Sequence, residues 1–187
     1  MSTGDSGLLL ARHGQTDDNL EPLRAQGFRD TPLNAVGIEQ AHALAERVAA
    51  DFKVSSLWSS DLVRATLTAQ IVGERIGLQP RLDPRLREGS RGDWEGRRFI
   101  DIAREEPEAY AAWMRGGAGF RFPGGESLQE HSDRVWEALE QIRAESPLPA
   151  LVVCHRGSIR TVLCRFDPRG LDAFHEYDVP NTGVVPL

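Results

Sequence analysis

Short apolar runs alternate along the chain with longer segments in which apolar residues recur every three or four positions. The short runs predict strands at residues 7–11, 54–58 and 150–154, with further extended pieces at 81–86 and 177–186. The longer segments predict helices at 35–50, from a cap at Ser60 or Asp61 to about 76, at 127–143, and from 155 to about 166. Because strands and helices alternate, the pattern indicates an α/β fold, a three-layer α/β/α sandwich with a mainly parallel central sheet.

The length and charge of the chain narrow this picture to one acidic domain. Its 187 residues, 40% of them hydrophobic, can bury one core but are too few for two ordinary domains, so we expect residues 1–187 to fold together. The net charge of −6 argues against general binding of nucleic acid or anionic membranes, which need clustered positive charge. Lys53 is the only lysine, so 21 of the 22 basic residues are arginines, whose guanidinium groups bind phosphate well.

The start of the chain and its cysteines favour a cytoplasmic protein. The opening MSTGDSG lacks the charged and apolar regions of a signal peptide, and no apolar stretch approaches the roughly 18 residues of a membrane span. The two cysteines, ten residues apart, fit a reducing compartment better than a disulfide framework. We therefore expect cytoplasmic localisation and no membrane partner.

Five polar side chains from distant parts of the sequence are expected at one edge of the sheet. Arg12 and His13 directly follow the first strand, Arg64 lies in the helix after the second, Glu88 follows the third extended segment, and His155 follows the strand at 150–154. In parallel sheets, ligands bind beyond the carboxyl ends of the strands. Cationic donors, a nucleophile and an acid are what phosphoryl transfer from an ester requires. The sequence therefore predicts a phosphate site at this edge.

These residues lie in motifs that cover nearly the whole chain. The matching stretches are ARHGQTDDN (11–19), QGFRDTPLNAVGIEQA (26–41), SSDLVRATLTA (59–69), LREGSRGDWEG (86–96), PGGESLQE (123–130), CHRGSIR (154–160) and PNTGV (180–184). In this order they resemble the histidine phosphatase superfamily, which has the phosphoglycerate mutase-like fold, and its phosphatase branch in particular. The RHG triplet alone is a weak signal, but the combination is highly specific.

The resemblance implies a catalytic role for each of the five side chains. It makes His13 the nucleophile that becomes a phosphohistidine, and Glu88 the proton donor to the leaving oxygen. It places Arg12, Arg64 and His155 around the phosphate, where they stabilise charge in the transition state.

The resemblance also implies contacts around the substrate and a small cap. Asn19 matches a position that often reaches the phosphate, and Gln26, with Gly27 beside it, is a looser candidate for substrate binding. The family builds its specificity cap in the segment that corresponds here to residues 97–125. The resemblance implies no metal and no bound cofactor, and homodimers are common in the family.

Cys154 offers a competing nucleophile. It stands five residues before Arg160 and Thr161, which matches the Cys-x5-Arg-[Ser/Thr] loop of cysteine-dependent phosphatases. That hypothesis leaves ARHGQT and SDLVRA unexplained, and no aspartate acid loop is evident in the sequence. We therefore predict that Cys154 ends its strand as a small buried side chain.

Two residues depart from the pattern of the family, and three histidines have no counterpart in it. Arg156 stands where the family usually has glycine, and Arg91 replaces a residue that is usually apolar. Arg156 either points outward, adds a cationic contact to the substrate, or partly obstructs the pocket. Surface or capping roles are expected for the remaining histidines, His42, His131 and His175. Trp94, Trp113, Phe120 and Arg121 are candidates for the leaving-group side, with core packing favoured for the tryptophans.

The function expected from these observations is hydrolysis of a small soluble phosphomonoester. The segment at 97–125 is shorter than the insertion of glycolytic mutases, and a small cap leaves a phosphoenzyme open to water. The main alternative is a phosphoglycerate mutase primed by 2,3-bisphosphoglycerate. A second is a phospholigand-binding module without catalysis. Among phosphatases, the sequence does not separate broad specificity from a dedicated substrate such as α-ribazole phosphate or a sugar-phosphoglycerate.

Overall fold

A computed structural model describes residues 7–187; the first six residues, which hold most of the MSTGDSG start, lie outside the described range. Within that range one sheet forms, in the spatial order β3-β2-β4-β1-β5. Its strands are β1 (Leu8–Arg12), β2 (Ser56–Ser59), β3 (Arg81–Leu82), β4 (Ala150–Cys154) and β5 (Val184–Pro186). Only β5 runs antiparallel, against β1. Every residue of β1 and β4 is buried, as expected for central strands covered on both faces.

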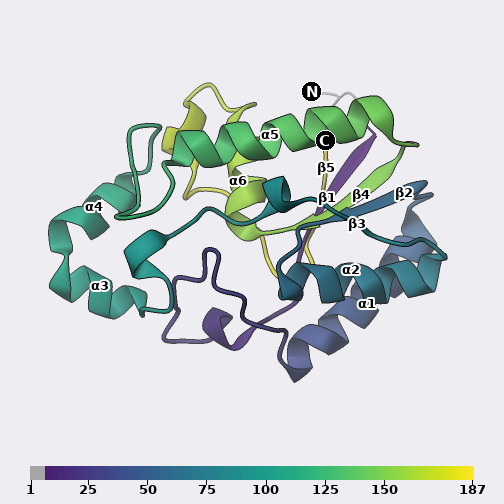
Figure 1. Ribbon diagram of the computed structural model, residues 1–187, viewed down its shortest axis with the longest axis horizontal. Coiled ribbons are helices and arrows are strands. Elements are labelled where there is room, and N and C mark those ends of the chain that lie inside the picture. Colours follow the sequence, from purple (N-terminus) through teal and green to yellow (C-terminus); the bar gives the residue numbers. More distant parts are fainter. Residues whose placement is uncertain (1–6) are drawn as a thin grey trace.

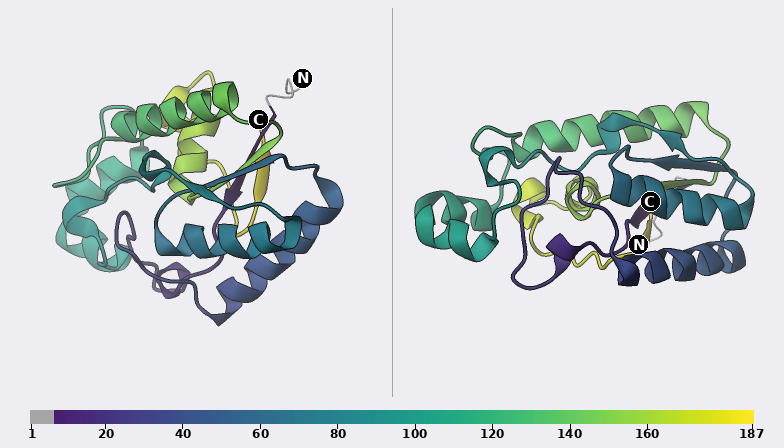
Figure 2. Two further views of the ribbon diagram at one scale, coloured as in Figure 1. Left: turned by 45° about the vertical axis from the view of Figure 1, so that its right-hand side comes forward. Right: turned by 60° about the horizontal axis from the view of Figure 1, so that its bottom comes forward.

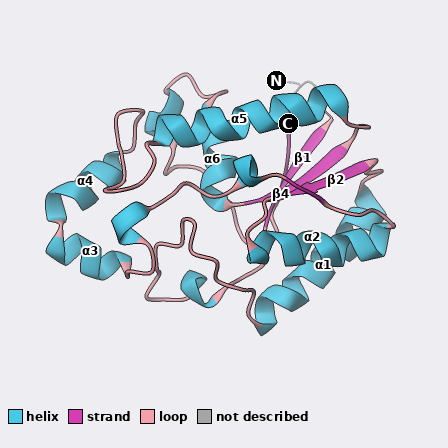
Figure 3. Ribbon diagram, in the orientation of Figure 1, coloured by secondary structure: helices cyan, strands magenta, loops and turns pink. Residues whose placement is uncertain are grey.

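Helices cover both faces of the sheet, which confirms the predicted three-layer α/β/α fold (Figure 1). On one face lie α1 (Ala35–Asp51) and α2 (Val63–Ile76), whose apolar residues form one core with Leu9 and Leu151. On the other lie α5 (Leu128–Glu145) and α6 (Arg156–Cys164), which form a second core with Leu10 and Val152. The strands therefore contribute alternate side chains to two cores. Figure 3 shows them between the helical layers.

Three boundaries differ from the sequence prediction, each for a local reason. The third extended segment pairs with β2 only at Arg81 and Leu82, because Pro84 begins a 3-10 turn and proline has no amide hydrogen to donate. The last strand starts at Val184, since the chain before it turns at Thr182, whose φ is 56°. Neither predicted cap opens α2. Leu62 takes the cap position without a side-chain hydrogen bond, and the Ser60 hydroxyl is used elsewhere.

The segment expected to form a cap holds two short helices, α3 (Phe99–Glu105) and α4 (Pro107–Arg115). They lie at one end of the molecule, away from the strands (Figures 1 and 2). A third apolar cluster joins them to the rest of the protein and includes Trp94, Ile102, Trp113, Phe122 and Phe174. No helix within the described range has both the length and the apolarity needed to cross a bilayer.

Candidate active site

The pairing of β1 with β4 brings two histidines together. Arg12 lies opposite Cys154 in the parallel register, so the next residues, His13 and His155, leave the sheet side by side. The His13 amide donates to the Cys154 carbonyl at 3.1 Å, and the two imidazole rings lie 5.2 Å apart between centroids. The site therefore lies at the carboxyl edge of the sheet, where ligands bind in parallel α/β folds.

Contacts of the His13 ring determine which nitrogen is available. Its Nδ1 lies 2.6 Å from the Gly14 carbonyl, which can only accept a hydrogen bond. Nδ1 therefore carries the proton and Nε2 keeps its lone pair. Burial, followed by the charges of Arg64 and Arg12, lowers the pKa of His13 well below its usual value. The imidazole is thus neutral at pH 7 and suited to nucleophilic attack.

The residues expected to hold the phosphate converge around His13. Arg12 Nη1 donates to the Val179 carbonyl at 2.8 Å, and Arg64 Nη2 donates to the Gly27 carbonyl at 2.9 Å. Arg12 Nε, Arg64 Nε and His155 Nδ1 are all buried without a hydrogen-bond partner. Burial lowers the pKa of both arginines to about 10, which still leaves them charged at neutral pH. Unpaired buried donors are costly unless a ligand satisfies them, so these atoms mark an anion site.

His155 is oriented by Ser60, one of the two residues expected to cap α2. The Ser60 hydroxyl lies 2.8 Å from His155 Nε2, and it also accepts from the Leu62 amide at 3.3 Å. A hydroxyl that accepts from Leu62 can donate its own hydrogen to Nε2, which leaves the imidazole proton on Nδ1. Burial first, and then Arg64, lowers the pKa of His155 well below its usual value. In this tautomer the neutral ring provides a hydrogen-bond donor at Nδ1.

Glu88 reaches the same pocket with its carboxylate held by backbone amides. Gly157 donates to Oε2 at 2.9 Å and Gly89 to Oε1 at 2.9 Å. Burial alone would raise the pKa of Glu88, but the charge of Arg91, the proximity of His131 and these two hydrogen bonds outweigh burial and bring the pKa to about 2. In the unliganded protein the carboxylate is therefore ionised.

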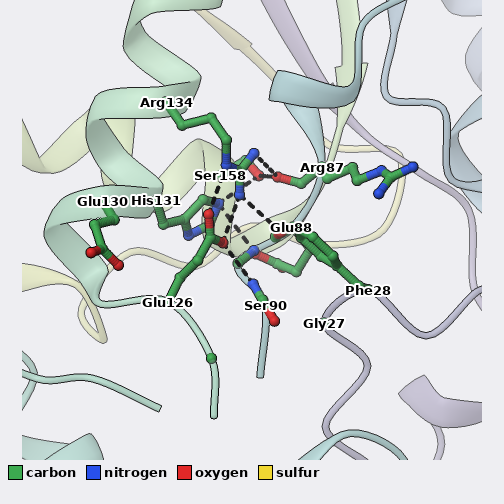
Figure 4. Close-up of polar contacts among 12 residues, drawn as sticks. Gly27, Phe28, Arg87, Glu88, Ser90, Glu126, Glu130, His131, Arg134 and Ser158 are labelled. Atoms are coloured by element: carbon green, nitrogen blue, oxygen red, sulfur yellow. Dashed lines mark hydrogen bonds and ion pairs between the residues drawn. The ribbon is translucent and has the colours of Figure 1, made fainter. Parts of the chain in front are cut away.

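His131 contradicts its expected surface or capping role. It is 2% exposed, and its Nε2 lies 3.7 Å from Glu88 Oε1 and 3.1 Å from Ser158 Oγ (Figure 4). Ser158 already donates to the Arg87 carbonyl, so it accepts a hydrogen from His131 Nε2. Burial lowers the pKa of His131 to about 4, so the ring is neutral. Its spacing from Leu128 and Val135 on the apolar side of the helix was the signal that could have identified it.

The backbone at Glu88 is held by an arginine of α5. Arg134 donates to the carbonyls of Arg87 and Glu88 at 3.1 and 3.2 Å (Figure 4). It also donates to the carbonyl of Arg85 at 2.7 Å. Its Nε and Nη2 both donate to Glu126 at 2.8 Å, a bidentate pair that fixes the guanidinium plane. The loop that carries Glu88 is therefore clamped to α5.

An open pocket of about 380 Å³ lies above these groups, a volume suited to a small molecule. The predicted residues that line it are Arg12, His13, Asn19, Gln26, Gly27, Glu88 and Arg156. Arg64 and His155 are fully buried and are not among the lining residues. In the described part of the chain, no three His, Cys, Asp or Glu side chains gather in a way that could hold a metal ion.

Asn19 and Gln26, two of the residues predicted to bind substrate, form hydrogen bonds within the protein. Asn19 Oδ1 accepts from the Thr16 amide at 3.1 Å and from Asn181 Nδ2 at 3.3 Å. Gln26 Nε2 donates to the Thr16 hydroxyl. Gly27 has a φ of +54°, and its carbonyl accepts from Arg64. These contacts order the loop between β1 and α1 beside the phosphate site.

Arg156 does not point outward. It lines the pocket, and its Nε is buried without a hydrogen-bond partner. Arg91, which the sequence marked as a departure from the family pattern, also lines the pocket. The sequence did not predict four further lining residues that bear on charge, Asp18, Arg24, Arg160 and His175. The Cys-x5-Arg spacing pointed to the segment that holds Arg160, although for a different chemistry.

Other expectations for exposed and aromatic residues have mixed outcomes. His42 is exposed, as predicted, whereas the imidazole of His175 lies 2.8 Å from the Trp113 carbonyl and faces the pocket. Trp94 is fully buried in the core, and Trp113 both packs in that core and lines the pocket. Arg121 pairs with Glu130 instead of lining the pocket.

Cys154 is a buried strand residue, as predicted. It is 1% exposed and packs in the core formed by α5 and α6. Burial raises the pKa of its thiol to about 12, so almost no thiolate exists at neutral pH. It is absent from the residues that line the pocket. Burial and the raised pKa of the thiol therefore argue against a cysteine nucleophile.

Comparison with known proteins agrees with this geometry. The sequence profile of the histidine phosphatase superfamily (branch 1) matches residues 8–187. The chain is 38% identical to phosphoglycerate mutase-like protein 4 of Arabidopsis thaliana, over 86% of this chain and 71% of that protein. It is 35% identical to a metal-independent phosphoserine phosphatase of the same plant, over 84% and 67% respectively. Its fold matches a mycobacterial glucosyl-3-phosphoglycerate phosphatase with a TM-score of 0.83 and 32% identity, over 94% of this chain and 87% of the other. The chain therefore belongs to the histidine phosphatase superfamily.

Proposed function

We propose that the protein is a metal-independent phosphomonoesterase that hydrolyses a small phosphorylated metabolite through a phosphohistidine at His13. The observation that carries the proposal is the His13–Gly14 hydrogen bond, which leaves an unprotonated Nε2 on a neutral ring. The ring lies within a cluster of cationic and unpaired donor groups, so an anionic phosphate is drawn to the nucleophile.

The reaction proceeds in two displacements. His13 Nε2 attacks phosphorus, the bond from phosphorus to the ester oxygen breaks, and Glu88 gives its proton to the departing oxygen. Water then attacks the phosphohistidine, the P–N bond breaks, and the Glu88 carboxylate takes the proton of the water. Inorganic phosphate leaves and His13 regains its lone pair.

Charge developed on the phosphoryl oxygens is stabilised by groups already in place. Arg12 Nε, Arg64 Nε and His155 Nδ1 are unpaired, and their side chains are anchored at other atoms. Donors that need no reorganisation contribute most to such catalysis. The side chains of the protein therefore stabilise the charge on the phosphoryl oxygens themselves.

Glu88 must be protonated to act as the acid, although its pKa is about 2 in the unliganded site. Among neighbouring charges, Arg91 lowers the pKa of Glu88 the most. A bound phosphate places negative charge in the same pocket and offsets the positive charge of Arg91. The pKa of Glu88 therefore rises when the phosphate binds. The substrate monoanion provides the proton as it enters.

The names of similar proteins support hydrolysis of a small metabolite. Two of them are phosphatases, of phosphoserine and of glucosyl-3-phosphoglycerate. The short helices α3 and α4 give a small cap, which favours access of water to the phosphoenzyme. One relative has a mutase-like name, so the mutase alternative enters the test.

The test is hydrolysis of p-nitrophenyl phosphate by the wild type, His13→Ala and Cys154→Ser, with EDTA present throughout. We expect hydrolysis by the wild type and Cys154→Ser, none by His13→Ala, and an acid-labile phosphoryl group on the wild type after rapid quenching. Loss of activity in EDTA would contradict metal independence, and activity in His13→Ala would refute the nucleophile. Transfer from 2,3-bisphosphoglycerate to phosphoglycerate, faster than hydrolysis, would favour the mutase. A stable complex with no turnover of any phosphoester would favour a binding module.

A further inference from the structure

The pocket holds more positive charge than one phosphate group needs. Arg12 and Arg64 already serve the phosphate beside His13. Four further arginines line the same pocket. Arg24 is exposed and donates to the Gly96 carbonyl at 2.8 Å, which leaves Arg91, Arg156 and Arg160. Against these, Glu88 and Asp18 are the carboxylates that line it.

The cations separate into two groups around two different histidines. The charges that most lower the pKa of His13 after burial come from Arg64 and Arg12. Burial also lowers the pKa of His175, but there the charges come from Arg160, Arg91 and Arg156. The second group therefore lies near His175 and also adjoins the catalytic groups. Arg91 has the largest charge effect on Glu88, and Arg156 has the largest on Arg12.

Two arginines of the second group are anchored on aromatic rings. Arg91 is 8% exposed, and its guanidinium carbon lies 4.7 Å from the ring centroid of Trp113 and 4.3 Å from that of Phe122. Arg160 is 7% exposed, and its guanidinium carbon lies 5.6 Å from the ring centroid of Phe174. Its Nε also donates to the backbone carbonyl of Tyr177 at 2.8 Å. Such contacts fix the orientation of a guanidinium group before any ligand arrives.

Arg156 completes this group and is held less tightly. It is the first residue of α6, directly after His155, and its Nε is buried with no hydrogen-bond partner. Its charge also lowers the pKa of Arg12 and of Arg160, in both cases second to burial. Repulsion among arginines in one pocket is relieved by an anion that lies between them.

We propose that Arg91, Arg156 and Arg160 form a second anion subsite, and that the substrate is a phosphate ester with a second anionic group, a carboxylate or another phosphate, on its leaving-group side. The phosphate subsite holds the ester at His13, and the second subsite holds the alcohol portion. The inference deepens the proposed function and rests on it. It also gives a role to Arg91 and Arg156, the two residues that depart from the pattern of the family.

The first experiment compares substrates that differ in one anionic group. Phosphoserine differs from phosphoethanolamine by a carboxylate, and propane-1,3-diol bisphosphate differs from the monophosphate by a phosphate. We expect the wild type to prefer the more anionic member of at least one pair, by roughly tenfold or more in kcat/KM, the scale of one charge-assisted hydrogen bond. The pair with the larger ratio tells whether the second group is a carboxylate or a phosphate.

Variants then assign that preference to the subsite. Arg156→Gln should reduce the ratio toward unity, and Arg156→Lys should keep part of it. Arg115→Gln removes an equal charge from an exposed position of α4 outside the pocket lining and should leave the ratio unchanged. Arg91→Gln is a second test within the subsite, with its thermal unfolding measured first because the side chain is buried.

The outcomes separate this inference from the proposed function. If the wild type hydrolyses both members of each pair equally, or if Arg156→Gln keeps the full ratio, the subsite is wrong and the phosphatase stands. If the wild type hydrolyses none of the four compounds, calorimetric titration of the wild type and Arg156→Gln replaces the kinetics. Tighter binding of the more anionic member, lost in Arg156→Gln, would then support the subsite without the phosphatase. Equal binding of both members would overturn it.

Discussion

Gly157→Ala tests whether Glu88 is the proton donor without altering either the nucleophile or the acid itself. Gly157 is in the first turn of α6, and its amide donates to Glu88 Oε2 at 2.9 Å. A Cβ at this position would lie 2.2 Å from Glu88 Oε1, whereas ordinary contacts begin at 3.4 Å. The carboxylate must therefore move by about 1 Å, and a misplacement of that size costs roughly a hundredfold in rate.

The fold is expected to tolerate this substitution. The backbone of Gly157 is helical, and alanine in a helix is favoured over glycine by about 1 kcal/mol. Gly119→Ala provides the matched control, because that glycine is exposed and its Cβ would have nothing within 4 Å. Both variants should unfold at temperatures close to that of the wild type.

The assay compares two leaving groups. p-Nitrophenolate departs with little help from an acid, whereas the alkoxide of glycerol 3-phosphate needs a proton. In Gly157→Ala we expect kcat to fall about a hundredfold for glycerol 3-phosphate and much less for p-nitrophenyl phosphate. Full activity on glycerol 3-phosphate in a folded variant would refute Glu88 as the donor. An equal loss on both substrates would point to a disturbed phosphate cradle instead.

Three further predictions concern titration and the cap. The pKa of His131 is about 4 in the folded protein and 6.5 in the unfolded chain, so protonation at acid pH favours unfolding. The free energy of unfolding should therefore fall as the pH is lowered from 6.5 to 4, by about 3 kcal/mol from this residue. Urea titrations at both pH values should show a smaller loss in His131→Gln; an equal loss contradicts the assignment. Because the pKa of His13 lies well below 6.5, kcat/KM corrected for substrate ionisation should stay level through pH 6.5, and a fall there would disprove a neutral His13. Ile102→Ala in α3 should lower the free energy of unfolding in urea by about 2–5 kcal/mol, because Ile102 is fully buried. Ile100 is 66% exposed, so Ile100→Ala should change that free energy by less than about 0.5 kcal/mol. Equal effects would mean that α3 is not packed as described.

Much of the fold and of the phosphate site could be predicted because the signals are local. The apolar runs at β1 and β4 predicted buried strands, and parallel pairing then requires that the residues after them, His13 and His155, emerge together. The same logic identified Cys154 as a strand residue. Element ends were less predictable, since Pro84 and Thr182 act through backbone geometry that an apolar pattern does not record.

The sequence by itself determined the α/β layering and the family, and it predicted the residues of the candidate site, because their motifs follow strands that end at one edge of the sheet. Only the tertiary structure decided which partners the buried polar side chains meet. His131 contacts Glu88 because α5 packs against the loop that carries Glu88. Arg91 and Arg156, far apart in the chain, face one pocket because the aromatic cluster and α6 meet there. The position of a residue in a helix or loop does not reveal which distant segments it will contact. A cluster of arginines from separate segments can therefore be recognised only once those segments are packed together.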